Sequence, residues 1–394
     1  MPDTAAQLSA VFPPPVMAAR AWADALDPAA RADLLNVSQA APVDPPPLSL
    51  RQEMARVVME LPEAHVYGPV LGLPALRNAI ATRWSTLYGG AIHPEEVAIT
   101  AGCNEAFAAA IASVADAGDD VILPTPWYFN HKMWLDMSGV GTRLLPCGAG
   151  MLPDVDQAEA LIGPRTRAIV LVTPNNPTGA EYPDSLLTAF AALARRRGLM
   201  LIVDETYRDF HSGNGAPHGL FAEDWQDVLI HLYSFSKVFR LTGHRVGALI
   251  ARRERLAQVE KFLDTVTICP AQVGQHAALY GLEHLGDWVA SERRDIHARR
   301  AAVEQGISGL EGWRVLGTGA YFAYLEHPFD IASDVLAQRL VAEAGVLLLP
   351  GTMFAPPLSS GGDGSAERQV RIAFANADLP GIDQLVRRLS GFAP

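Results

Sequence analysis

Short apolar runs alternate with amphipathic stretches between residues 49 and 285. Runs with the length of a β-strand, each bounded by Gly, Pro or Asp, occupy residues 96–100, 120–123, 168–173, 199–203, 228–233 and 246–251. Between most of them the apolar residues recur with a helical period, as at 104–115 and 182–197. Alternating strands and helices predict a mostly parallel sheet with helices on both faces. The sequence therefore predicts a large three-layer α/β/α domain over residues 49–285.

The two ends of the chain follow other patterns. Residues 1–48 are rich in Pro and Ala, and two proline triplets exclude a regular helix or a central strand where they stand. We expect an extended arm there, with a short helix near 16–25. Beyond residue 286 we predict helices to about 310, at 332–344 and at 379–390, and strands at 321–325 and 369–374. These elements predict a smaller α+β domain over 286–394, with which the arm packs.

Composition and charge exclude several classes of protein. The 394 residues suffice for two domains with cores of their own, and 49% hydrophobic with 19% charged residues is typical of a folded chain. No window is apolar over the roughly 18 residues that a membrane helix needs. The formal net charge of −12, with Arg and Lys scattered, argues against binding to nucleic acid.

The cysteines and the N-terminal residues indicate a cellular compartment. Cys103, Cys147 and Cys269 are widely spaced and lack the paired spacing of metal-binding motifs, so no metal site is predicted. The first residues do not form a basic segment followed by an apolar one, which is the pattern of a secretion signal. We expect a protein of the reducing cytoplasm.

Two junctions at predicted strand ends carry candidate chemistry. Segment 100–106 follows a strand and opens a helix, so free backbone N–H groups could receive an anion, and Gly102 permits a close approach. An ordinary turn with Asn104 as the helix cap explains the same residues. Segment 173–179 ends the most apolar strand in turn-forming residues. It is either a tight turn alone or a turn that projects the Asn176 amide into a cleft.

A carboxylate stands at the end of the predicted strand 199–203. Acidic side chains are rarely buried without a partner, so Asp204 is expected to be paired, to cap the chain or to take part in chemistry. The carboxyl ends of parallel strands share one edge of a sheet, where such sheets bind ligands. Asp204 is therefore expected near the other strand-end residues.

The segment 234–247 places hydroxyl groups, a lysine and an arginine just before an apolar run. A guanidinium fork with hydroxyl donors suits a phosphate dianion, so Ser234, Ser236 and Arg245 could bind one phosphate beside Lys237. A surface loop with scattered polar residues is the alternative. This alternative is less favoured, because all four segments are predicted to lie at one edge of the sheet.

In this order, the motifs resemble those of the class I/II aminotransferases of fold type I, a family that depends on pyridoxal phosphate. The resemblance covers roughly residues 30–394. Each motif is weak alone, but the ordered set is specific: Tyr67 with Gly68 and Gly72, Gly102, Pro126-Trp127-Tyr128, Asn176-Pro177-Thr178-Gly179, Asp204 with Tyr207, Ser234-Phe235-Ser236-Lys237 with Arg245, and Val370-Arg371-Ile372.

The resemblance implies a role for the central polar residues. Lys237 would bind the cofactor covalently and then move a proton at the substrate's Cα. Asp204 would keep the pyridine nitrogen protonated. Tyr207 and Asn176 would donate hydrogen bonds to the phenolic oxygen of the cofactor, and Asn176 would also lie against the substrate.

Further roles follow from the same resemblance. Phosphate-binding residues would be Gly102, Cys103, Asn104, Ser234, Ser236 and Arg245. Tyr128, preferred to Trp127, would stack on the cofactor ring. Tyr67 would reach the phosphate of a partner subunit, which implies a homodimer with shared active sites. Arg371 would bind the α-carboxylate of the substrate through two parallel hydrogen bonds. The alternatives are that Tyr67 and Tyr128 are core aromatics, and that Arg371 pairs with a structural acid.

The chain departs from the family pattern at three places, of which the alanine at 355, where glycine is usual, is minor. Ala40 stands where the family has a glycine whose backbone contacts the substrate carboxylate, so that contact is expected to differ. Relatives that prefer dicarboxylates have an arginine near 261–272 for the distal carboxylate, and residues 262–270 contain none. Aspartate is therefore not expected to be the preferred donor. Asp264 could attract a cationic side chain, although a solvated or capping role is favoured.

The resemblance predicts an enzyme that transfers the α-amino group of an L-amino acid to a 2-oxo acid in two half-reactions. A carbon–sulfur β-lyase or a related synthase is the alternative, because both share the first step, removal of the Cα proton. A regulator that senses the cofactor is disfavoured because no DNA-binding domain is added. A nicotinamide-dependent dehydrogenase is disfavoured because no G-x-G-x-x-G follows the first strand.

Overall fold

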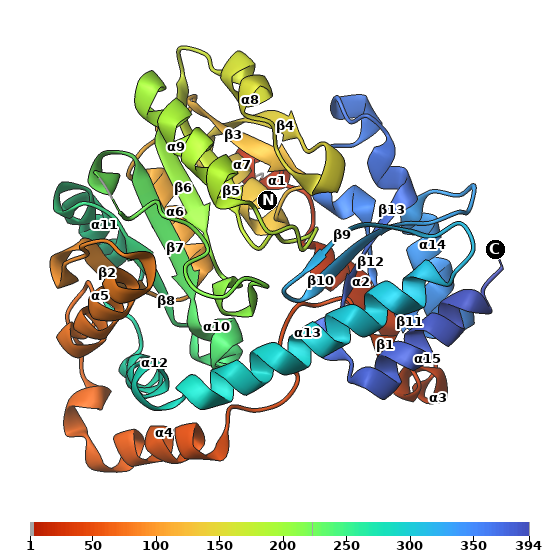
Figure 1. Cartoon of the computed structure of the whole chain (residues 1–394), viewed down its shortest axis with the longest axis horizontal. Helices are drawn as coiled ribbons and strands as arrows, with labels where there is room; N and C mark the ends of the chain where they lie inside the picture. Colours follow the sequence, from red (N-terminus) through yellow and green to blue (C-terminus); the bar gives the residue numbers. More distant parts are fainter. Residues whose placement is uncertain (1–3, 223, 394) are drawn as a thin grey trace.

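The computed structural model describes residues 4–222 and 224–393. Its largest sheet has seven strands in the order β2-β8-β7-β6-β5-β3-β4 (Figure 1). β8 is antiparallel to both of its neighbours, and the other adjacent pairs are parallel. The strands are β2 (Val97–Thr100), β3 (Asp120–Thr125), β4 (Gly141–Pro146), β5 (Thr166–Val172), β6 (Met200–Asp204), β7 (Leu229–Ser234) and β8 (Gly247–Ile250). The prediction of a mostly parallel sheet is confirmed.

Helices cover both faces of this sheet. Neighbouring residues of β5 point to opposite faces, so Ile169 and Leu171 belong to one core while Ala168 and Val170 belong to another. The first core lies under α5 (Pro74–Tyr88), α8 (Val155–Leu161), α9 (Asp184–Arg197) and α12 (Gln272–His284). The second lies under α6 (Cys103–Ala112), α7 (Phe129–Ser138) and α11 (Arg253–Val266). The domain therefore has the three predicted layers, with one apolar core on each face of the sheet.

A smaller sheet has the order β12-β13-β10-β9, and every pair in it is antiparallel. Its strands are β9 (Arg314–Gly319), β10 (Phe322–Glu326), β12 (Leu349–Pro350) and β13 (Gln369–Ala373). A third core lies between this sheet and three helices, α13 (Gly286–Ser308), α14 (Ser333–Arg339) and α15 (Leu379–Ser390). The mixture of helices and antiparallel strands agrees with the predicted α+β architecture.

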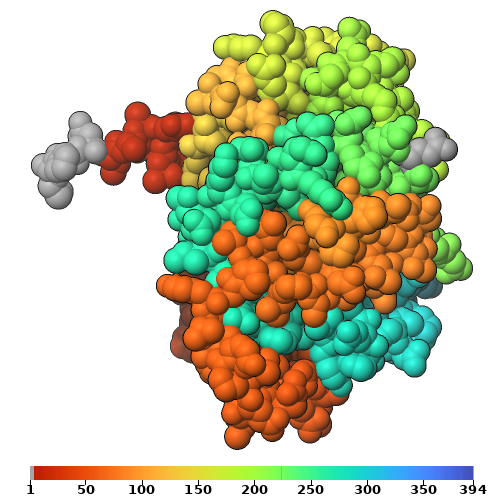
Figure 2. Space-filling view, turned by 90° about the vertical axis from the view of Figure 1, so that its left-hand side faces the viewer, coloured from red at the N-terminus to blue at the C-terminus, as the bar shows by residue number. Residues whose placement is uncertain are grey.

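The N-terminal arm carries α1 (Ala6–Ser9), α2 (Pro15–Asp24), α3 (Pro28–Ala32) and β1 (Leu35–Asn36), and α4 (Leu48–Glu60) follows it. β1 pairs in parallel with β11 (Val346–Leu347), which ties the arm to the C-terminal part of the chain. The segment with α1 projects from the body of the molecule (Figure 2). The domain bounds at 48/49 and 285/286 stay a prediction, because α13 contacts both the smaller sheet and the turn that follows β6.

Five strands within the described residues have no counterpart in the sequence prediction, namely β4, β9 and the two-residue strands β1, β11 and β12. β4 lies at the edge of the large sheet and β9 at the edge of the small one, and most of their residues are only half-buried. Polar residues and glycines interrupt both β4 and β9, so these two strands lack the continuous apolar run on which the strand predictions were based. The helix predicted over 332–344 consists of α14 followed by a single π-helical turn, Leu340–Ala344.

Candidate functional site

A cavity of about 170 Å³ lies beyond the carboxyl ends of β5, β6 and β7. It is lined by Cys103, Asn104, Tyr128, Val172, Asn176, Asp204, Thr206, Tyr207, Ser234, Ser236, Lys237 and Arg245. Most of the residues predicted for the site are therefore brought together from five separate segments. Val172 and Thr206 were not predicted, and both simply flank predicted residues at strand ends. No group of three or more His, Cys, Asp or Glu side chains within the described residues is arranged for a metal ion.

Lys237 lies in α10 (Phe235–Val238), the short helix that follows β7. Its Nζ donates a hydrogen bond to the carbonyl oxygen of Ala40 in the arm. Burial, reinforced by the nearby charges of Arg245 and Arg371, lowers the pKa of Lys237 to about 8. A lysine with such a pKa has an appreciable neutral fraction near neutral pH and can act as a nucleophile or a base.

Asp204 ends β6 and is buried. Its Oδ1 accepts a hydrogen bond of 2.9 Å from the backbone N–H of Thr206, and its Oδ2 lies 3.2 Å from Nε2 of His131. Burial alone would raise the pKa of Asp204, but His131 and Thr206 together hold it below its usual value. Asp204 is therefore a buried anion that faces the cavity and can stabilise a positive charge there.

His131 is a residue of the site that the sequence reasoning missed. It lies on α7, its ring stacks on Phe107 at a centroid distance of 3.8 Å, and its Nε2 faces Asp204. No local pattern marks this histidine, since it stands in an amphipathic helix with its neighbours. Only the folded sheet brings α7 next to the end of β6.

The predicted anion-binding residues form one cluster. Gly102 has a φ of +86° and caps α6, and a Cβ at this position would lie 2.1 Å from Nη2 of Arg245. Nη1 of Arg245 donates to Oγ of Ser236 at 3.4 Å. Ser234 accepts a hydrogen bond of 3.2 Å from the backbone N–H of Ser236. A guanidinium, two hydroxyl groups and the N-terminus of a ten-residue helix thus surround a place that suits a phosphate.

The residues predicted to contact the cofactor ring line the same cavity. Asn176 stands in the turn after β5, and Tyr207 follows β6. Burial raises the pKa of Tyr207 well above its usual value and also raises the pKa of Tyr128, so both phenols remain protonated donors. Tyr128 faces the cavity, whereas Trp127 is buried and its backbone N–H donates to Phe354.

Arg371 lies on β13 of the small sheet and is 1% exposed. Its Nη1 donates to Oδ1 of Asn176 at 3.0 Å, its Nη2 donates to the carbonyl oxygen of Ser38, and its Nε has no partner within the described residues. Burial lowers its pKa to about 10, so it remains a cation at neutral pH. No carboxylate of the described residues pairs with Arg371, which leaves its charge available for an acidic ligand.

Tyr67 is not brought into the cavity of its own chain. It is 78% exposed and borders a surface hollow with Cys269, Pro270 and Gln272. Val66, Met59 and Ile268 are further exposed apolar residues of segments 50–70 and 250–270, which form adjoining surface in Figure 2. The view of Tyr67 as a core aromatic is wrong, since a core side chain would be buried.

Comparisons with known proteins show the class of protein to which this fold belongs. The profile of the family "Aminotransferase class I and II" matches residues 32–389. The chain is 30% identical to the aromatic aminotransferase of Arabidopsis thaliana over 354 residues, which span 86% of this chain and 88% of the relative. It is also 30% identical to a probable N-succinyldiaminopimelate aminotransferase of Mycobacterium tuberculosis over 93% of this chain and 94% of the relative.

Solved structures show the same likeness. The aspartate aminotransferase of Thermus thermophilus with maleate superposes with a TM-score of 0.89 at 25% identity, over 99% of both chains. This chain belongs to the class I and II aminotransferase family, and it is an enzyme of the transferase class. The resemblance predicted from the motifs is thereby confirmed. Members of this family use pyridoxal phosphate.

No helix within residues 4–222 and 224–393 is both long and apolar enough to cross a membrane.

Proposed function

We propose that this aminotransferase binds pyridoxal phosphate at Lys237 and uses it to move the α-amino group of an L-amino acid to a 2-oxo acid. One observation carries the proposal: a buried lysine with a lowered pKa shares a cavity with a buried carboxylate, Asp204, and with an anion-binding cluster around Arg245. These three features match the aldehyde, the pyridine nitrogen and the phosphate of that cofactor.

The residues present fit the cofactor. Arg245, Ser234, Ser236 and the backbone N–H groups of Cys103 and Asn104 would hold the phosphate. The absence of a Cβ at Gly102 leaves the space that Arg245 occupies. Tyr128 would stack on the ring. Asn176 and Tyr207 would donate hydrogen bonds to its phenolic oxygen, and Asp204 would keep a proton on the ring nitrogen through its negative charge.

The bound cofactor would supply an electron sink for the pair of electrons left at the substrate's Cα. Lys237, once released by the incoming amino group, would take the proton from the substrate's Cα and deliver it to the C4′ carbon of the cofactor. Arg371 would hold the α-carboxylate and so orient the Cα–H bond toward Lys237. The carbonyl oxygen of Ala40, which accepts from Nζ of Lys237, would steady the free amine during these steps.

We infer that neutral amino acids are better donors than aspartate. Helix α11 and the residues after it lead into the exposed segment beside Tyr67, and residues 262–270 have no arginine for a distal carboxylate. The relatives bear the names of aromatic, aspartate/prephenate and N-succinyldiaminopimelate aminotransferases. Their names therefore differ in substrate, and a preference of this chain for neutral donors is compatible with that range.

We further propose a homodimer in which Tyr67 of each chain binds the phosphate held by the other. Its 78% exposure and the apolar residues around it support an interface there. A cytoplasmic location agrees with the free thiols of Cys103, Cys147 and Cys269.

The experiment follows each half-reaction by the absorbance of the cofactor. Purified protein loaded with pyridoxal phosphate is mixed with single L-amino acids, and we expect the yellow colour to fade to that of the amine form and to return with a 2-oxo acid. No response across a broad panel would refute the proposal. The β-lyase alternative is not favoured by the comparisons, and it would instead release pyruvate and ammonia from cystathionine without any 2-oxo acid.

A further inference from the structure

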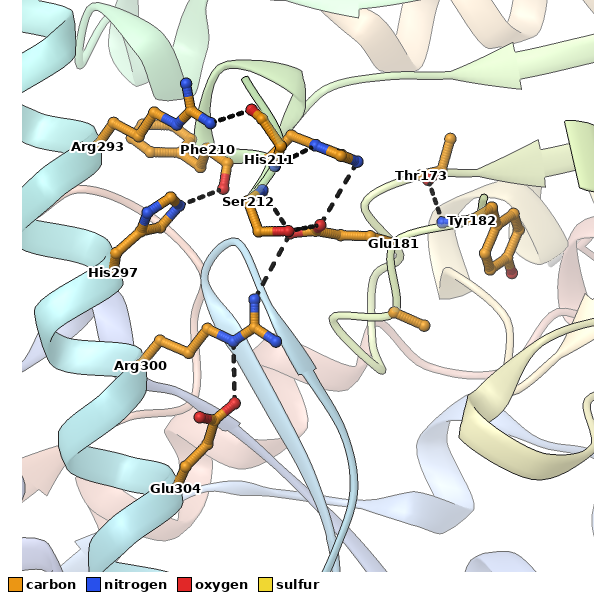
Figure 3. A network of polar contacts seen from close by, with 12 residues as sticks. Thr173, Glu181, Tyr182, Phe210, His211, Ser212, Arg293, His297, Arg300 and Glu304 are labelled. Atoms are coloured by element: carbon orange, nitrogen blue, oxygen red, sulfur yellow. Dashed lines mark hydrogen bonds and ion pairs between the residues drawn. The ribbon is translucent and has the colours of Figure 1, made fainter. Parts of the chain in front are cut away.

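A polar network joins the turn after β5 to the segment after β6 and to helix α13 (Figure 3). Its centre is Glu181, whose side chain is 14% exposed. Oε1 of Glu181 accepts a hydrogen bond of 2.9 Å from the backbone N–H of Ser212, and Oε2 accepts one from the Ser212 hydroxyl. His211 and Arg300 place cationic or proton-bearing nitrogens 3.4 and 3.6 Å from the same carboxylate.

The first segment that this network joins is the closed turn that carries Asn176. The backbone N–H of Tyr182 donates to Oγ1 of Thr173 at 2.9 Å, and the N–H of Asn175 donates to the carbonyl oxygen of Ala180 at 2.8 Å. Glu181 therefore lies between the two residues that close the turn. Since the turn is bonded at both ends, a force on Glu181 acts on the segment that positions Asn176.

The second segment in the network is the one that follows Tyr207. Residues Arg208–Phe210 form a single 3-10 turn, in which the N–H of Phe210 donates to the carbonyl oxygen of Tyr207. The N–H of Gly213 donates to Nδ1 of His211 at 2.9 Å, so in the neutral ring the proton is on Nε2, which faces Glu181. Glu181 thus holds this segment through its two successive residues, His211 and Ser212.

The third part of the network is one face of helix α13. Arg293, His297 and Arg300 succeed one another at intervals of four and three residues, so they share a face. Arg293 donates to the carbonyl oxygen of Gly213, Nε2 of His297 lies 3.1 Å from the carbonyl oxygen of Phe210, and Arg300 reaches Glu181. Figure 3 shows these side chains pointing from α13 toward the segment after β6 and toward Glu181.

Backbones also meet closely beside Glu181. The hairpin between β9 and β10 presses on the Asn176 turn, since a Cβ at Gly319 would lie 2.2 Å from the carbonyl oxygen of Gly179. The same Cβ would lie 3.5 Å from Oε1 of Glu181. The small sheet therefore touches the turn directly, and Glu181 stands where the turn, the hairpin and α13 meet.

We propose that Glu181 is a positioning residue for the transfer reaction: it couples the placement of Asn176 and Tyr207 to helix α13. Asn176 and Tyr207 are the two side chains proposed to bond the cofactor's phenolic oxygen, so this inference rests on the proposed function. With Glu181 intact, the two segments are held in one arrangement and both donors point to the same place. Without it, each segment moves independently and the two hydrogen bonds become longer and weaker.

The test compares wild-type protein with Glu181→Ala and Glu181→Gln, all loaded with pyridoxal phosphate. The measured quantity is the pH midpoint of the cofactor's colour change, which responds to hydrogen bonds at the phenolic oxygen and needs no substrate. Weaker donors stabilise the deprotonated form less, so we expect both variants to shift the midpoint upward. We also expect kcat to fall by about fivefold, which is the value of one ordinary hydrogen bond, with little change in KM.

Glu304→Gln is the matched control, because Glu304 is the other acidic partner of Arg300, with 3.0 Å between Nε and Oε1, but does not contact the turn. It should leave the midpoint and kcat as in wild type. A purely structural role would lower the urea midpoint of the Glu181 variants and leave the colour midpoint unchanged, and that result would overturn the inference. If Glu181→Ala does not fold, Glu181→Gln decides alone, since it keeps the volume and loses the charge toward His211 and Arg300.

Failure of the proposed function gives a different result. Wild-type protein that stays yellow with every amino acid refutes transamination, whatever the variants do. Wild-type protein that reacts, together with variants that keep its colour midpoint and kcat, refutes only the role of Glu181.

Discussion

Asp204 and Glu205 are consecutive residues that serve opposite sides of the large sheet. Asp204 faces the cavity and lies 3.2 Å from His131, whereas Glu205 is fully buried on the other side, where Tyr88, His218 and His231 contact its carboxylate. The alternation of side chains along a strand separates the two carboxylates, although the chain places them next to each other. One acid is therefore available to a ligand, and the other belongs to the protein interior.

Replacing Glu205 by Gln is expected to destabilise the apoprotein by about 3 kcal/mol at neutral pH. Removing one partner of a buried charged network leaves the remaining polar groups without compensation. The free energy of unfolding in urea, measured for both proteins, checks this value. Equal unfolding midpoints would contradict the expectation.

The same comparison has a pH dependence. Burial opposes ionisation, but His218 and His231 hold the pKa of Glu205 well below its usual value of 4.5. A carboxyl group with a depressed pKa in the folded state stabilises the protein above its unfolded-state pKa, and this stabilisation is lost as the pH falls. The difference between wild type and Glu205→Gln should therefore be largest at neutral pH and should shrink below pH 4.5.

The rate at which the apoprotein takes up pyridoxal phosphate should rise with pH and level off above about pH 8. The neutral amine attacks the aldehyde, and burial lowers the pKa of Lys237 to about 8 from 10.5. Rapid-mixing absorbance at a series of pH values measures this rate. A rate that still rises steeply up to pH 10.5 would show that the lysine is not perturbed.

Lys237→Ala is the companion variant. It should retain the fold and bind the cofactor without a covalent bond, and turnover should fall by roughly 10²- to 10⁴-fold or more, the usual contribution of a positioned acid–base group. Transfer at the wild-type rate would remove Lys237 from the mechanism.

Arg371→Lys should raise KM for the amino donor by roughly tenfold or more, because a hydrogen bond to a charged group contributes about 1.5 to 3 kcal/mol. The lysine keeps the charge but loses the two-pronged geometry of the guanidinium. Steady-state kinetics give the value. Arg314→Lys is the control, since Arg314 lies on β9 and pairs at the surface with Glu326. Equal KM values for the two variants would contradict the role of Arg371.

Tyr67→Phe should weaken retention of the cofactor by about tenfold, as expected for the loss of one hydrogen bond to a charged phosphate. Equilibrium dialysis of the holoprotein measures the affinity, and size-exclusion chromatography measures the oligomeric state. Tyr280→Phe serves as a control, because Tyr280 lies on α12 and packs against His284. A fully active monomer would contradict the shared site.

The central sheet could be predicted because its strands are buried on both faces. β5 and β6 read as continuous apolar runs in the sequence, and the structure places them side by side in the centre of the sheet. The edge strands β4 and β9 could not be found by that rule, because solvent on one side permits polar residues.

The site was predictable where residues follow strand ends, since the topology of a parallel sheet brings those ends together. Asn176, Asp204 and Lys237 are of this kind, and they line one cavity. His131 and Glu181 were missed because their contacts depend on how a helix or a turn packs, which no local pattern encodes. The roles assigned to the predicted residues stay proposals until the variants are measured.

The contact between Arg371 and the carbonyl oxygen of Ser38 joins residues that are 333 positions apart. β1 likewise pairs with β11, which is synthesised long after it. During synthesis the arm therefore lacks both its partner strand and its contact with Arg371 until β11 and β13 have been made.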